Sequence, residues 1–593
     1  MIKHIVTSAA ISAAALAVST NAGRADNGWS NNGGSNIKHV LLISIDGMHA
    51  LDFINCVSGS TPTCPNLASL KTVGANYLEA STSKPSDSFP GLTAIVSGGS
   101  PRTEGAFYDV AYDRVLAPPL NTTGNGLAGG ACIRNAPNGT GTEYEEGIDI
   151  DQTKLNGGAP GAGTYEGGIA SIDSTKLVRD PYNACQPVWP WNFVRTNTIF
   201  GVIHQSGGYV AWSDKHPAYS SVAGNSSVAG PAGSILDDYY SPEINSTPIP
   251  LPVTLPNGTP CNPLPDQAAA TASGADYTTS FQNVQCYDQL KANAILNQIN
   301  GLKHNGSAKA PVPNLFGMNF QAVSVGQKLI EKTFNPPLKG GYVDNVGTPS
   351  APLASAIKFV DASIGQMIAA LKSTGDYNST LIVITAKHGQ SPVDSSRYQG
   401  IGVPSGSPIN TSPATILTNC LTPSQSNAQI GPTEDDVSLI WLNQSVQGCT
   451  TTAAVAQLQA QSPSSNNGAG IGQIFSGNGI AQMFNPPGLP PQGDPRTPDI
   501  IVTPNVGVTY SGSSKKQAEH GGFSHDDTNV MLLLSNPGLR PVTVTTQVET
   551  AQVAPTILQA LGLDPSALQA VRIEGTQVLP GVFSRDKDGS WDH

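Results

Sequence analysis

Charged residues are scarce in this sequence of 593 residues, at 12% where about 25% is usual. This scarcity excludes a coiled coil and an array of helical repeats, which are rich in charged helix formers. The net charge of −12 is small for the length, so the chain lacks the charge density of a disordered protein. With a pI near 5.2, the sequence also gives no indication of a nucleic-acid-binding surface.

Long apolar runs are also missing. The apolar stretch Ala9–Val18 is too short to span a bilayer, which takes about 20 residues, and no other stretch qualifies. It follows Lys3 and precedes small residues, so residues 1–25 are predicted to be a signal peptide. A buried N-terminal helix is the alternative. Residues 26–36 form a polar Gly/Asn linker, and we expect a secreted or periplasmic protein.

The chain has eight cysteines but no C-x-x-C pair, which argues against a zinc ribbon and a thioredoxin-type site. An even number of cysteines fits an exported protein in an oxidising compartment. Eight cysteines allow 105 connectivities. Pairing of sequence neighbours is our hypothesis, namely Cys56–Cys64, Cys132–Cys185, Cys261–Cys286 and Cys420–Cys449.

Glycine and proline are abundant, at 63 and 47 residues, and they are concentrated in the linker and in residues 112–310. We interpret 112–310 as a loop-rich insertion pinned by disulfides. The segments on either side, 37–111 and 311–593, alternate apolar strands with helices of period 3.6. Such alternation predicts an α/β fold with a mainly parallel central sheet flanked by helices. The clearest elements are strands at 39–46, 314–321, 380–385, 499–503 and 529–534 and helices at 65–75, 351–375 and 546–563.

Polar side chains follow several predicted strands and would meet at one edge of the sheet. Asp46 ends the first strand, and His388 follows the strand at 380–385. Ser88 lies just before a helix expected to begin at Pro90, where free N–H groups favour an anion. His520 stands in a Glu-His-Gly-Gly motif before a late strand. Taken singly, each has a structural alternative such as a turn or a helix cap, and their spacing does not name a reaction.

The order of these motifs resembles the alkaline phosphatase superfamily, in its type I phosphodiesterase/nucleotide pyrophosphatase branch. The resemblance lies at both ends of the chain and is greatest to a secreted subgroup with AKHGQSP and AEHGG motifs. It is carried by HVLLISIDGM (39–48), SDSFPGLTAIVSGGSPRTEG (86–105), FVDASIGQMIAAL (359–371), TLIVITAKHGQSP (380–392), AEHGG (518–522) and VAPTILQALGL (553–563).

The resemblance implies an alkaline-phosphatase-like fold and two divalent metal ions, commonly zinc, on either side of a Ser or Thr nucleophile. That nucleophile attacks phosphorus and forms a phospho-enzyme, which water then hydrolyses. Transferred to this chain, Ser88 matches the nucleophile and contacts the metal. Asp46, His388 and His520 match metal ligands.

Several positions depart from the family pattern. Lys387 stands where the family has an Asp immediately before the histidine. The Asp-x-x-x-His ligand pair falls on Val323 and Gln327, neither of which binds zinc. An Asn that holds phosphate oxygens aligns with Asp109. The resemblance therefore leaves each of the two metal sites short of ligands.

Our hypothesis is a single-metal or strongly altered site, with one or two metals left open. Lys387, together with Lys215 in the sequence Asp-Lys-His, would bind the anion as a fixed positive charge. His520 or Asp109 would complete the ligand set of Asp46 and His388. In the alternative, Lys387 pairs with Asp109 and catalysis is lost.

The predicted function is hydrolysis of a small-molecule phosphate ester outside the cytoplasm, with diesters favoured over monoesters by the branch resemblance. Two alternatives remain open at this point. One is a non-catalytic anion-binding protein on the same fold, and the other is a hydrolase of sulfate or phosphonate esters. The sequence does not determine the oligomeric state.

Overall fold

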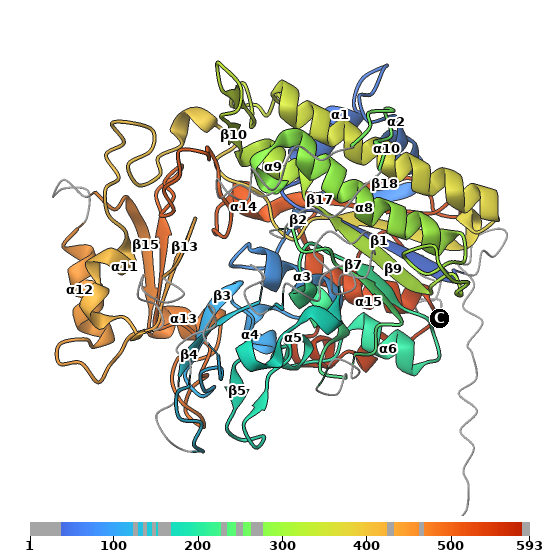
Figure 1. Ribbon diagram of the computed structural model, residues 1–593. Helices are drawn as coiled ribbons and strands as arrows, with labels where there is room; N and C mark the ends of the chain where they lie inside the picture. The colour runs from blue at the N-terminus through green and yellow to red at the C-terminus, as the bar shows by residue number, and fades with distance from the viewer. Residues whose placement is uncertain are drawn as a thin grey trace, which may run out of the picture.

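A nine-stranded sheet runs through the centre of the computed structural model (Figure 1). The structure describes residues 37–121, 129–134, 139–144, 150–151, 168–226, 230, 234–244, 253–261, 277–423, 432–461 and 468–583. The predicted signal peptide and linker lie outside the described residues.

The strand order of the central sheet is β18-β2-β17-β12-β1-β9-β7-β8, with β19 also beside β2. Most neighbours are parallel, as predicted, but β17 is antiparallel to both β12 and β2. The strands are β1 (His39–Ile45), β2 (Gly74–Ser81), β7 (Ala211–Ser213), β8 (Asp238–Tyr240), β9 (Leu315–Phe320), β12 (Thr380–Thr385), β17 (Asn529–Ser535), β18 (Val542–Val544) and β19 (Val548–Glu549).

Helices cover both faces of the sheet because the central strands are apolar on both faces. In β1, Leu41 and Ile43 belong to one hydrophobic cluster, and Val40 and Leu42 belong to the other. The first cluster lies under α1 (Ala50–Val57), α2 (Pro65–Lys71), α8 (Phe281–Ile299), α9 (Ala322–Lys328) and α10 (Ala351–Thr374). The second lies under α3 (Ser88–Ser97), α6 (Ile199–Gln205) and α15 (Val553–Ala560).

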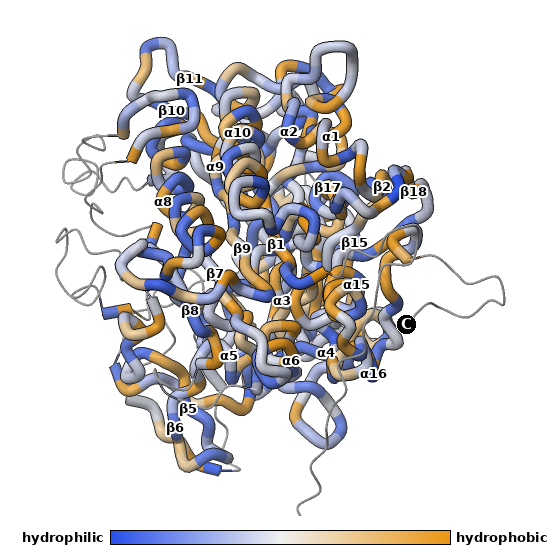
Figure 2. The backbone as a smooth tube through the Cα atoms, turned by 90° about the vertical axis from the view of Figure 1, so that its right-hand side faces the viewer, coloured by the Kyte–Doolittle hydropathy of each residue, from blue (hydrophilic) through white to orange (hydrophobic). Residues whose placement is uncertain are grey.

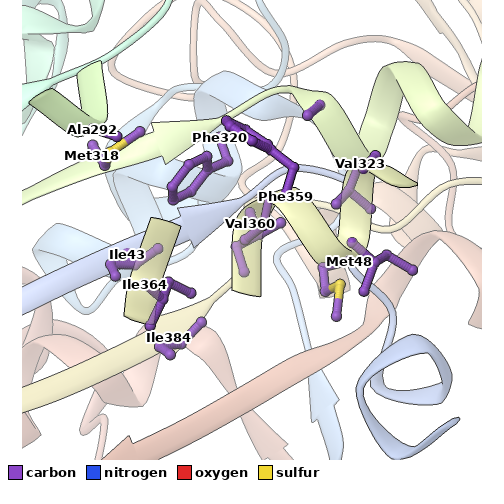
Figure 3. Packing of buried hydrophobic residues seen from close by; sticks show 14 of the residues in the cluster. Ile43, Met48, Ala292, Met318, Phe320, Val323, Phe359, Val360, Ile364 and Ile384 are labelled. Atoms are coloured by element: carbon purple, nitrogen blue, oxygen red, sulfur yellow. The ribbon is translucent and has the colours of Figure 1, made fainter. Parts of the chain in front are cut away.

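The long helix α10 is the main cover of the first face. Its Ile364 lies beside Ile43 of β1 and Ile384 of β12 (Figure 3), and its Phe359 meets the ring of Phe320 edge-on at 6.1 Å. Among the described helices, α10 alone is long and apolar enough to cross a membrane, and its apolar residues are buried in this core. Apolar and hydrophilic residues alternate along α8 and α10 in Figure 2, as expected for helices with one buried face.

A second, four-stranded antiparallel sheet stands apart from the central one, on the left of Figure 1. The strand predicted at 499–503 is present as β16, but it belongs to this sheet and not to the central one. An apolar strand does not by itself determine which partners it pairs with. The sheet consists of β13 (Thr433–Glu434), β14 (Ser438–Ile440), β16 (Ile500–Pro504) and β15 (Ile471–Ser476).

Residues 112–310 contribute β7, β8, α6 and α8 to the central α/β layers, in addition to loops. The division into a core and an insertion stays a prediction, but this stretch shares the central sheet. The four predicted disulfides are all confirmed: Cys56–Cys64, Cys132–Cys185, Cys261–Cys286 and Cys420–Cys449. Two of them lie wholly within 112–310.

A buried carboxyl group joins this stretch to the first core segment. Glu104 ends α4 (Pro101–Glu104), and its Oε1 accepts a hydrogen bond of 2.5 Å from Thr196 Oγ1. Its Oε2 finds no hydrogen-bond partner among the described residues. Burial raises the pKa of Glu104 from its usual 4.5 to about 7, so the folded protein holds the proton more tightly than the unfolded chain does.

We therefore predict that Glu104 makes the folded state less stable as pH rises from 4.5 to 7. Glu104→Gln keeps the bond from Thr196 and removes the titration. Between these pH values, wild type should lose on the order of 1–3 kcal/mol of unfolding free energy that the variant keeps. Urea unfolding of both proteins at pH 5 and pH 7.5 measures the difference, and an equal pH dependence in the two would contradict the prediction.

Candidate functional site

Four adjacent parallel strands, β12, β1, β9 and β7, end at one place on the edge of the central sheet. Each brings polar residues to that place, which is where α/β folds bind ligands. Lys387 and His388 follow β12, and Asp46 follows β1. Asn319 and Gln321 end β9, and the pair 214–215 (Asp-Lys) follows β7. All of these side chains are buried.

Asp46 is the central anion of the site. Its Oδ1 accepts a hydrogen bond from Asn319 Nδ2 at 2.7 Å, and its Oδ2 accepts one from Gln321 Nε2 at 2.6 Å. His388 Nε2 and Lys387 Nζ lie 3.7 Å and 4.0 Å from Oδ2. Burial would raise the pKa of Asp46, but the positive charge of Lys387, with His388, outweighs it and holds the pKa well below the usual value.

Lys387 forms a buried ion pair with Asp214. Its Nζ lies 3.0 Å from Oδ1 and 3.1 Å from Oδ2 of Asp214, and 3.9 Å from the centre of the Tyr219 ring. Trp212 Nε1 donates a 3.0 Å hydrogen bond to the same carboxylate. The alternative in which Lys387 pairs with Asp109 is therefore wrong, because Asp214 already holds the ammonium group.

Ser88 is buried at the first position of α3, two residues before Pro90. Lys215 Nζ donates a hydrogen bond of 3.2 Å to its Oγ. The helix lies directly against the chain that follows β12, since a Cβ on Gly91 would stand 2.1 Å from the carbonyl oxygen of Lys387. This close approach places Ser88 beside the edge where both lysines lie.

Asp87 is the N-cap of α3. Its carboxylate therefore already binds to part of the helix N-terminus where we expected an anion. Its Oδ2 accepts hydrogen bonds from the backbone N–H of Phe89, at 3.3 Å, and of Asp109, at 2.9 Å. Asp109 is thus connected to the site by its backbone N–H, which donates to Asp87. The carboxylate of Asp109 accepts a hydrogen bond from the N–H of Val110. Burial, with the charge of Asp109, raises the pKa of Asp87 well above its usual value.

The two histidines stack face to face. Their ring centres are 3.8 Å apart and their planes differ by 16°. His388 Nδ1 lies 2.7 Å from the carbonyl oxygen of Gly389, and His520 Nδ1 lies 3.0 Å from Glu519 Oε1. Burial and the neighbouring His388 hold the pKa of His520 well below its usual value, which favours its neutral form.

The pKa of Lys215 is strongly shifted in the site. Burial lowers its pKa to about 7, while the charge of Asp46 opposes the shift. Its backbone N–H donates to Asp214 Oδ1 at 2.8 Å, so the two neighbouring residues are fixed together. The adjacent His216 points elsewhere, with Nδ1 2.6 Å from Glu243 Oε1.

These residues do not fit the metal pair that the resemblance implies. Catalytic zinc takes three protein ligands, and the described part of the chain contains no group of three His, Cys, Asp or Glu side chains able to hold a metal. The lone pairs of stacked imidazoles lie in parallel planes, so His388 and His520 do not point at one ion, as the single-metal hypothesis with both histidines as ligands would require. Val323 packs in the hydrophobic core (Figure 3), and Gln327 Nε2 donates to the carbonyl of Gly47.

The structure brings together Asp46, Ser88, Lys215, Lys387 and His388, and it stacks His520 on the ring of His388. Their roles in binding or catalysis stay predictions. Sequence reasoning missed Tyr219, Asn319 and Gln321. For the last two a signal existed, because amides interrupt the apolar strand NLFGMNFQ at its carboxyl end. Tyr219 has no such signal, because only the fold brings it to Lys387.

We predict that Gly91→Ala disturbs the site through packing alone. The new methyl group would overlap the Lys387 carbonyl, so α3 and the loop after β12 have to move apart. We expect a loss of about 1–3 kcal/mol of unfolding free energy, in the range of overpacked cores. Denaturant unfolding measures this loss. Gly479→Ala, at an open position inside α13 (Asn478–Met483) and without a positive φ, controls for the substitution itself.

Comparisons with known proteins agree with this architecture. Murine ectonucleotide pyrophosphatase/phosphodiesterase 5 is 14% identical over 89% of this chain and 96% of its own, with a TM-score of 0.49. An inactive form of that murine protein in complex with AMP gives 13% identity, the same coverage and a TM-score of 0.50, which shows the fold alone. No curated protein matches the sequence. The model of the type I phosphodiesterase/nucleotide pyrophosphatase family matches residues 40–155 and 339–527, just over half of the chain. The chain therefore belongs to the type I phosphodiesterase/nucleotide pyrophosphatase family.

Proposed function

We propose that this protein hydrolyses phosphate esters with Ser88 as the nucleophile. The observation that carries the proposal is the contact between Lys215 Nζ and Ser88 Oγ, at 3.2 Å. A serine hydroxyl at the start of a helix and at the end of a parallel sheet is already placed next to a cation. Family membership supports a phosphoric ester as the substrate.

The reaction would proceed in two displacements. Ser88 Oγ forms a bond to phosphorus as the bond from phosphorus to the leaving oxygen breaks. The hydroxyl proton of Ser88 passes to the leaving alcohol. A water oxygen then forms a bond to phosphorus as the bond from Ser88 Oγ to phosphorus breaks. One proton of the water passes to Ser88 Oγ, and the other stays with the phosphate monoester that is released. Lys387 and Lys215 would hold the phosphoryl oxygens as these bonds change.

The substrate would be a small molecule that carries one negative charge. Asp46 and Asp214 both lie against Lys387, and their negative charges repel a diester with one charge less than a monoester with two. The family resemblance favours a diester as well. The related murine protein binds AMP, which makes a nucleotide ester a reasonable first substrate to test.

Export of the protein is part of the proposal. The described residues contain four disulfides, and disulfides form and persist in an oxidising compartment and not in the cytosol. Together with the predicted signal peptide in residues 1–25, they favour a secreted or periplasmic enzyme. We also assign the chain to the secreted subgroup with the AKHGQSP and AEHGG motifs.

One observation favours a second candidate, a non-catalytic anion-binding protein. Three positions where the family has metal ligands hold Lys387, Val323 and Gln327. A protein that kept the anion pocket without the chemistry would look the same at these positions. A panel of phosphate monoesters, diesters, sulfate esters and phosphonates separates the candidates, since binding without turnover on every ester supports the second.

We predict that Ser88→Ala lowers turnover of an aryl phosphodiester by about 10³-fold or more, because the nucleophile is lost. The fold should persist, since the removed hydroxyl makes only local contacts, with Lys215 Nζ and with the Tyr219 side chain. Initial rates and circular dichroism measure the two effects.

Ser97→Ala, at the other end of α3, is the matched control and should leave the rate within about threefold of wild type. An unchanged rate in Ser88→Ala would remove this residue from the mechanism. No turnover of any ester by wild type would instead reject the hydrolase function.

A further inference from the structure

The ends of β12 and β7 place two lysine ammonium groups where the family relies on metal ions. Lys387 Nζ lies between two carboxylates, 4.0 Å from Asp46 and 3.0 Å from Asp214. Lys215 Nζ lies at Ser88 Oγ. A cation beside each of the two functional oxygens, Asp46 Oδ2 and Ser88 Oγ, is the arrangement that metal ions would otherwise supply.

The position of Lys387 is fixed from three sides. Asp214 holds its ammonium group, the Tyr219 ring lies beneath it at 3.9 Å, and its carbonyl touches α3 at Gly91. A metal ion bound to Asp46 would therefore lie close to an ammonium group that Asp214 holds 4.0 Å from Asp46 Oδ2. Two like charges at this separation in a buried site repel strongly.

A buried donor is also left for a ligand. The hydroxyl of Tyr219 is fully buried. The Ser88 side chain lies near enough to interact with it, but without full hydrogen-bond geometry. Buried polar groups are nearly always paired, so a hydroxyl of this kind indicates a missing acceptor. The Tyr219 ring lies near both lysines, 3.9 Å from Lys387 Nζ and 5.7 Å from Lys215 Nζ. An anion held by the lysines would bring that acceptor.

We propose that Lys215 and Lys387 replace the metal ions of the family, and that the site binds a phosphoryl anion without any metal. The inference rests on the proposed function of the same site and extends it to how the anion is held. Lys387, oriented by Asp214, and Lys215 bind two oxygens of the anion, and the Tyr219 hydroxyl donates to a further one. Asn319 and Gln321 hold Asp46 in the position that a metal would otherwise fix.

The test measures binding of inorganic phosphate by calorimetry to the full-length protein, before and after exhaustive dialysis against EDTA. Metal content is measured by mass spectrometry on the same samples. We expect binding to change less than threefold on dialysis, with less than 0.1 metal ion per chain remaining. Binding that disappears with the metal and returns with Zn²⁺ would overturn the inference.

Variants identify the residues. Lys215→Met, and the double variant Lys387→Met/Asp214→Asn, which removes the ammonium group together with its nearest carboxylate, should each weaken phosphate binding more than tenfold. Lys358→Met on the exposed face of α10 is the control and should bind as wild type does. Equal phosphate binding by all variants contradicts the inference. The dialysis result does not depend on these variants, so it stands even where one fails to fold.

Turnover of an aryl phosphodiester, measured in parallel, separates this inference from the proposed function. Turnover that needs Zn²⁺ overturns the metal-free site and leaves the hydrolase function intact. Metal-free phosphate binding without turnover supports the lysine site and rejects catalysis.

Discussion

The buried ion pair between Lys387 and Asp214 is the interaction on which the rest of the site depends. A lysine in a dry interior is costly unless a carboxylate lies against it. Asp214 can do so only because β7 lies next to β9 and ends level with β12 and β1. The same carboxylate binds Trp212 and the backbone of Lys215, so the ion pair also orients the second lysine. The arrangement of charges at the edge of the sheet therefore depends on the order of its strands.

Two positions where the resemblance places metal ligands have structural contacts in this chain. Val323 stands at a position where the resemblance places a metal-binding carboxylate. It packs in the core under α10 with the other apolar side chains of Figure 3. Gln327 is tied to the Gly47 carbonyl, directly after Asp46. Both residues stabilise the loop that carries Asp46 by ordinary packing and hydrogen bonding.

The parts of the fold that could be predicted are those with a strong local pattern. The apolar run at 380–385 and the 3.6-residue period at 351–375 give β12 and α10 almost to the residue. The three-residue strands β7 and β8 lie in a segment rich in Gly and Asn, where no periodicity can develop. The antiparallel direction of β17 is also set by distant partners, because its apolar sequence suits either direction.

The same division applies to the site. Asp46, Lys387 and His388 could be found because they follow strong strands directly. The pairing of Lys387 could not, because Asp214 is 173 residues away in the chain and only the sheet brings it near. The position of Tyr219, in a short 3₁₀ segment (Pro217–Ala223), likewise depends on the whole fold. Long-range charge pairing leaves no trace in the local sequence.

The distance along the chain between Lys387 and Asp214 has a consequence for how two remote segments depend on each other. Lys387 lies in a segment that the family model matches, and Asp214 lies outside both matched segments. Removing either partner alone strands a charge in the interior, at a cost of about 3–5 kcal/mol. The two positions are therefore coupled in energy. One half of the ion pair lies in the matched segment with the AKHGQSP motif, and the other half lies in the stretch between the two matched segments.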